Sequence, residues 1–111
     1  MEVTFNDVND VTVVRINGSV DGLTAEGLMG ALGAQVRNGR TRMVADFASV
    51  DYTSSAGLRA LLSTMKEVRQ LGGDFRLASV RPEVHRVLEL SGFTSILKLY
   101  GDVDTAVASY A

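Results

Sequence analysis

The chain has 111 residues, which is the length of one domain, and 46% of them are apolar, enough to form a core without metal or disulfide support. The absence of cysteine excludes structural disulfides, thiolate catalysis and thiolate metal sites. The net charge of −2 and the dispersed basic residues argue against a nucleic-acid-binding face, which clusters lysine and arginine. We expect a single domain spanning residues 1–111.

The sequence contains no candidate targeting, membrane or metal-binding segment. Glu2, Asp7 and Asp10 make the N-terminus acidic, without the apolar run of a signal peptide. No segment approaches the roughly 20 apolar residues that cross a bilayer. One histidine and scattered acids offer no metal-ligand spacing, and Met29, Met43 and Met65 are expected in the core. We expect a cytoplasmic protein without metal or cofactor and without a membrane partner.

Residues 3–16 are expected to form a β-hairpin. Val3–Phe5 is predicted as a short strand and the β-branched run Val11–Ile16 as a second one. The segment Asn6–Asp10 between them is predicted as a turn, because Asn and Asp bond their own backbone and tolerate left-handed conformations.

A helix is predicted from about Thr24 to Val36, where apolar residues recur on one helical face. It contains three glycines at a spacing of three, each costing up to about 1 kcal/mol relative to alanine in a helix interior. The sequence leaves open whether this spacing allows close backbone approach or leaves the helix soft. The apolar face consists of Ala25, Leu28, Leu32 and Val36, and the glycines are Gly27, Gly30 and Gly33.

The second half of the chain repeats the alternation of strand and helix. Strands are predicted at 43–47, 75–80 and 96–99, with a polar loop at 49–54. The clearest amphipathic helix follows that loop, and Gly72-Gly73 ends it. Pro82 begins another helix that Gly92 ends, and Asp102 caps a final one. The apolar face of the clearest helix consists of Leu58, Leu61, Leu62, Met65 and Val68.

This order of elements predicts the α/β fold class. Strands that alternate with helices form βαβ units, which have parallel strands and right-handed crossovers. We expect a mostly parallel five-stranded sheet with one antiparallel edge strand and four helices.

The segment most informative about function is residues 51–62, which follows a strand and opens the clearest helix. It brings three hydroxyl groups, those of Thr53, Ser54 and Ser55, to a helix N-terminus, where backbone N–H groups are free and anions are favoured. In open parallel sheets, sites are usually built where strands lead into helices. Serine and threonine are also the preferred N-cap residues, and capping alone accounts for most such pairs.

The segment resembles the signature of the STAS domain, named for sulfate transporters and anti-sigma factor antagonists. That signature reads, in order, Asp or Ser, then Ser, a small residue, Gly and Leu. The resemblance extends in register along nearly the whole chain. The similar segments are Gly18-Ser19-Val20-Asp21, Asp46-Phe47, Ser54-Ser55-Ala56-Gly57-Leu58, Leu71-Gly72-Gly73 and Leu90-Ser91-Gly92-Phe93.

The resemblance implies that Ser55, two positions before the Gly-Leu pair, is a phosphorylated serine. Ser54 is the alternative phosphoacceptor; in the best-known antagonists an Asp stands in its place. Asp21 matches a family position near the phosphoacceptor, and the small residue Gly57 is consistent with close approach of a partner. The implied partner surface comprises Asp21, Thr53, Ser54, Ser55, Gly57 and Leu58.

The resemblance further implies a non-enzymatic anti-sigma factor antagonist. The unphosphorylated domain would bind an anti-sigma factor that is a serine kinase, phosphorylation of Ser55 would release it, and a phosphatase would reset the switch. The alternatives are a STAS scaffold, the small subunit of a lipid-transport complex, and an antagonist in another signalling pathway.

A serine hydrolase is the enzymatic alternative. A nucleophile elbow has the pattern G-x-S-x-G, whereas Thr53 stands two residues before Ser55. The only histidine, His85, falls in a different predicted helix, where a lone histidine is usually a surface or boundary residue. The sequence therefore favours a binding module.

Overall fold

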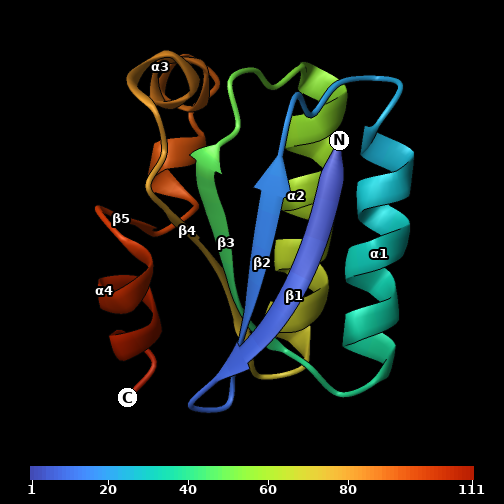
Figure 1. Cartoon of the computed structure of the whole chain (residues 1–111), viewed down its shortest axis with the longest axis vertical. Coiled ribbons are helices and arrows are strands. Elements are labelled where there is room, and N and C mark those ends of the chain that lie inside the picture. The colour runs from blue at the N-terminus through green and yellow to red at the C-terminus, as the bar shows by residue number, and fades with distance from the viewer.

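The computed structural model describes all 111 residues and contains five strands, four α-helices and one 3₁₀ turn (Figure 1). The elements of the N-terminal half are β1 (Glu2–Val8), β2 (Val11–Asn17), α1 (Ala25–Arg37), β3 (Arg42–Ser49) and α2 (Ser55–Gln70). Those that follow are β4 (Asp74–Ala78), α3 (Pro82–Leu90), the 3₁₀ turn η1 (Phe93–Ser95), β5 (Leu99–Tyr100) and α4 (Val103–Ala108).

The five strands form one sheet in the order β1-β2-β3-β4-β5. β1 is antiparallel to β2, and every other neighbouring pair is parallel. The predicted α/β class, the antiparallel edge strand and the four helices are confirmed.

Helices cover the two faces of the sheet unequally. α1 and α2 pack against each other on one face, where their buried side chains join those of the strands in a core of 19 residues. On the other face, Ala106 and Val107 of α4 pack on Val11, Val44 and Ala78. Figure 1 shows α4 beside β4 and β5, far from α1. None of the helices combines the length and the apolar composition that crossing a bilayer requires.

The hairpin turn is shorter than predicted. β1 continues to Val8, which pairs with Val11, so that only Asn9 and Asp10 form the turn. Both have positive φ, 50° and 65°, as in the two-residue turns whose twist matches paired strands. The predicted five-residue turn was wrong because Asn6 and Asp7 pair with β2 instead of bending the chain.

The predicted fifth strand exists, but it begins at Leu99 instead of Ile96. Gly92, with φ of 77°, ends α3, and the chain then forms the turn η1. The backbone N–H groups of Ile96 and Leu97 both donate to the carbonyl of Phe93. Because these N–H groups bond within the turn, they are not free to pair with a strand, and pairing with β4 begins only at Leu99.

α1 buries the predicted residues Ala25, Leu28, Leu32 and Val36. Gly27 and Gly30 do not serve close packing within the chain, because Cβ atoms there would meet nothing within 4 Å, and a Cβ at Gly33 would meet only the end of the Arg37 side chain, at 3.3 Å. Met29 is 41% exposed, so its prediction as a core residue was wrong, whereas Met43 and Met65 are buried.

The start of α2 lies directly on the loop between β2 and α1. A Cβ atom at Gly57 would lie 2.6 Å from the carbonyl oxygen of Val20 and 2.7 Å from Oγ1 of Thr53. Real Cβ atoms do not approach others this closely, and Val20 and Thr53 are themselves buried and cannot move aside. Packing inside the chain therefore requires glycine at position 57.

We predict that Gly57→Ala lowers the free energy of unfolding by about 1–3 kcal/mol, the usual cost of overpacking. Gly27→Ala is the matched control. It adds the same methyl group to an exposed helical position and should stabilise the protein by about 0.5–1 kcal/mol. Urea denaturation followed by circular dichroism measures both changes. Equal effects of the two substitutions would contradict the close contact with Val20.

Asp74, at the start of β4, is 8% exposed and fixes the far end of α2. Its carboxylate accepts hydrogen bonds from Nε of Arg69 (2.8 Å), Nε of Arg76 (3.1 Å) and the N–H of Phe75 (2.9 Å). Burial alone raises the pKa of the Asp74 carboxyl. The hydrogen bonds from Arg69, Phe75 and Arg76 outweigh burial, and the net pKa lies below its ordinary value.

Because the Asp74 pKa is depressed in the folded state, its contribution to stability is present at neutral pH and is lost as the pH falls through that pKa. Asp74→Asn should lower the free energy of unfolding by about 1–3 kcal/mol at pH 7. The difference from the wild type should shrink below pH of about 4, the pKa of an unfolded Asp. Glu67→Gln, at an exposed position of α2, is the control for charge. Urea titrations at several pH values test this, and a difference independent of pH would contradict it.

Candidate functional site

The segments that lead from β2 into α1 and from β3 into α2 lie side by side at the carboxyl ends of these strands. The N–H of Val20 donates to the carbonyl of Tyr52 (2.9 Å), and the N–H of Ser54 donates to the carbonyl of Val20 (2.8 Å). Val20 and Thr53 thus form an isolated parallel β-bridge that lies outside β2 and β3. This bridge fixes the first turn of α2 against the segment that contains Asp21.

The two serines at the start of α2 differ in what their hydroxyl groups do. Ser54 is the N-cap: its Oγ accepts a hydrogen bond from the N–H of Gly57 (3.2 Å), and its backbone is extended. Ser55 is the first residue of the helix and is exposed, and its hydroxyl forms no hydrogen bond within the chain. Capping therefore accounts for Ser54 and leaves the Ser55 hydroxyl free for a reaction or a partner.

Asp21 is half-buried and holds the segment before α1. Its Oδ1 accepts hydrogen bonds from the N–H groups of Leu23 (2.9 Å) and Thr24 (3.1 Å). The Thr24 hydroxyl lies 3.3 Å from the same oxygen and also donates to the carbonyl of Ser19 (3.0 Å). Asp21 therefore has a structural role through one carboxylate oxygen.

Three residues of the implied partner surface are buried: Thr53 is 2% exposed, Leu58 is 3% exposed, and Gly57 is buried by the loop at Val20. Leu58 belongs to the main core. This chain's own atoms cover each of the three, so direct contact of these side chains with a partner stays a prediction that their burial does not favour. They support the site from beneath, and Ser55, with parts of Ser54 and Asp21, remains accessible.

Two exposed apolar side chains at this end of the molecule were missed in the sequence. Leu23, between Asp21 and Thr24, is 94% exposed, and Tyr52, in the segment before α2, is 52% exposed. A signal was present: Leu23 lies outside the apolar face of α1, and Tyr52 interrupts a polar segment. Exposed apolar side chains are a common component of protein-binding surfaces.

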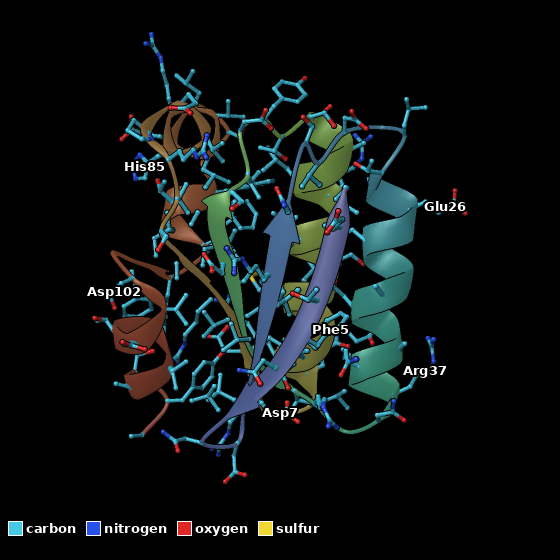
Figure 2. The ribbon with its side chains drawn as sticks, viewed as in Figure 1. Phe5, Asp7, Glu26, Arg37, His85 and Asp102 are labelled. Carbon is cyan, nitrogen blue, oxygen red and sulfur yellow. The ribbon has the colours of Figure 1, made fainter.

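Charged side chains of both signs lie on α2, on α1 and on the segment before α2. Asp51 accepts a hydrogen bond from the Ser19 hydroxyl (3.1 Å) and is exposed. Glu26 projects outward from the first turn of α1 (Figure 2). Arg59, one helical turn after Ser55, is exposed and belongs to none of the four ion pairs.

His85 is not a partner of Ser55. It is exposed on α3, as predicted, and Figure 2 shows it on the side of the molecule away from α1. It lines a shallow hollow that does not include Ser55, and the two side chains share no hydrogen bond. The hollow is formed by Val80, Pro82, His85, Arg86, Glu89 and Leu90.

Comparisons with known proteins agree with this fold and show the family. The STAS domain model matches residues 2–106. The anti-sigma factor antagonist BtrV of Bordetella bronchiseptica is 36% identical over 110 residues, which are 99% of this chain and 95% of that protein. A crystal structure from Thermotoga maritima, described as an anti-sigma factor antagonist, has a TM-score of 0.92 at 22% identity and covers 96% of this chain and 92% of its own.

The Bacillus cell-fate determinant SpoIIAA, solved in its phosphorylated form, has a TM-score of 0.75 at 19% identity, with 99% of this chain and 100% of that chain covered. At this identity, and at that of the Thermotoga structure, the likeness concerns the fold. The match of the domain model over almost the full length, together with the BtrV identity, shows the family. The chain belongs to the STAS domain family.

Proposed function

We propose that this STAS domain is an anti-sigma factor antagonist that binds a serine-kinase anti-sigma factor through the surface around Ser55 and is released when Ser55 is phosphorylated. The observation that carries the proposal is that the Ser55 hydroxyl is exposed and forms no hydrogen bond within the chain, whereas the neighbouring Ser54 hydroxyl caps α2. The relatives support it, since BtrV is named as an anti-sigma factor antagonist and SpoIIAA exists in a phosphorylated form.

In this mechanism the kinase transfers the γ-phosphoryl group of ATP to Oγ of Ser55; the hydroxyl proton leaves and ADP departs. The product carries about −1.5 to −2 charges and three acceptor oxygens. Asp21 and Asp51 lie on the segments that adjoin the first turn of α2, so the new charge makes this surface strongly anionic. A partner surface fitted to a small hydroxyl would lose contact, and each 1.4 kcal/mol lost weakens binding tenfold.

The proposed partner contact is mainly apolar at its centre. Leu23 and Tyr52 offer the exposed apolar surface of this end, and burying such a side chain contributes about 1.5–3 kcal/mol. No rearrangement of the domain is needed, because the buried residues beneath Ser55 already fix its position. A phosphatase that removes the phosphate would restore binding. This cycle would take place in the cytoplasm and involves neither nucleic acid nor membrane.

We predict that the protein isolated from its source carries phosphate on Ser55. Ser55→Ala should abolish the modification, whereas Ser54→Ala should retain it and instead cost about 1 kcal/mol of stability through loss of the N-cap. Phosphopeptide mass spectrometry identifies the modified residue. Phosphate on Ser54 in the Ser55→Ala protein would contradict this assignment and identify the N-cap Ser54 as the phosphorylated residue.

In a pull-down, Ser55→Asp should lose the kinase partner that the wild type retains. The same experiment discriminates between the functions that remain open. In a scaffold or a small subunit of a lipid-transport complex the Ser55 hydroxyl would be structural, and Ser55→Asp would keep its partner at equal strength.

We also predict that Leu23→Ala weakens partner binding by at least about tenfold, the equivalent of losing most of a buried leucine contact. Leu71→Ala is the control, because Leu71 is 59% exposed at the opposite end of α2. Neither substitution should change the urea midpoint noticeably, since both side chains lie in solvent. Equal affinities of the two variants for the partner would show that the surface around Leu23 is not the contact.

A further inference from the structure

Arg59 is an exposed cation one turn after Ser55 on α2. Its side chain forms no hydrogen bond or ion pair within the chain. Residues three and four positions away are its neighbours on the helix surface, and none of them is acidic; the neighbours are Ser55, Ala56, Leu62 and Ser63. Arg59 therefore has no anionic partner on α2 in the unmodified protein.

The geometry of a helix directs Arg59 toward Ser55. Helical side chains lean toward the N-terminus, so a residue covers the turn that precedes it. Side chains at positions i and i+4 have Cβ atoms about 5–6 Å apart, and an anion placed before a cation is the favourable order. A guanidinium on Arg59 can therefore reach oxygens attached to Ser55, and two parallel N–H donors suit a phosphate.

The charges of α2 make such a pair more favourable. The first turn of α2 contains no acidic residue, so the positive end of the helix is uncompensated while Arg59 adds a further positive charge near it. The negative charge of a phosphate on Ser55 would compensate both the positive end of the helix and the Arg59 guanidinium. Arg81, a cation near the end of β3, instead donates its Nε to the carbonyl of Ala48 (2.9 Å).

We infer that Arg59 is a positioning residue that pairs with the phosphate of phosphorylated Ser55. The inference rests on the proposed function, since it concerns the phosphorylated form of the same serine. The pair holds the phosphate over the first turn of α2, in the space that a bound partner would occupy. It also stabilises the helix in the phosphorylated state, so phosphorylation blocks the surface without disordering it.

The test uses the full chain with phosphoserine incorporated at position 55 during translation, so that no kinase is needed. A ³¹P NMR titration measures the second pKa of the phosphate. The Arg59 guanidinium should lower this pKa, and Arg59→Gln should raise it by about 0.15–0.4, because the second ionisation adds one charge to the pair and a helical ion pair is worth that much. Lys66→Gln, which removes an exposed cation farther along α2, should leave it unchanged. The carboxylates of Asp21, Asp51 and Glu26 act equally in all three proteins.

Thermal unfolding gives a second readout. Phosphoserine should raise the melting temperature of the wild type relative to serine, and Arg59→Gln should remove most of that increase, whereas Lys66→Gln should retain it. The same phosphate pKa and the same thermal increase in wild type and Arg59→Gln would overturn the inference. This result is distinct from failure of the proposed function, in which natural protein would lack phosphate on Ser55 whatever Arg59 does.

Discussion

The first turn of α2 rests on the backbone of Val20, and the space between them admits only a glycine. A Cβ atom at Gly57 would lie 2.6 Å from the Val20 carbonyl oxygen, which already accepts a hydrogen bond from the N–H of Ser54. This contact joins the segment before α1 to the segment before α2. Because both segments are fixed by it, the position of Ser55 relative to Asp21 follows from packing inside the chain, and the surface around Ser55 is preformed.

A division of roles between neighbouring side chains gives this surface its chemistry. Ser54 satisfies a free N–H group of the helix, so Ser55 does not have to. Asp21 uses one carboxylate oxygen to shape its own segment. Leu23, whose side chain has no place in the core, is left in solvent beside it. An exposed hydroxyl among fixed neighbours suits regulation by phosphate, since a charge added there changes the surface and leaves the core intact.

The sequence predicted the architecture well because its apolar periodicity is regular. It identified the buried faces of α1 and α2, since Leu28, Leu32 and Leu61 recur at helical spacing. It failed at residues 96–98, where backbone hydrogen bonds to Phe93 outweigh strand propensity. At the site it singled out Ser55. It predicted Leu58 on the apolar face of α2, but it could not tell that Gly57 faces inward, because burial at the start of a helix depends on a loop distant in sequence.

In the proposed function, phosphate controls partner binding at the Ser55 hydroxyl. Isothermal titration calorimetry with the anti-sigma factor recovered in the pull-down tests it most directly, comparing the domain with serine and with phosphoserine at position 55. We expect phosphoserine to weaken binding by at least about a hundredfold, equivalent to about 2.8 kcal/mol. Equal dissociation constants for the two forms would contradict it.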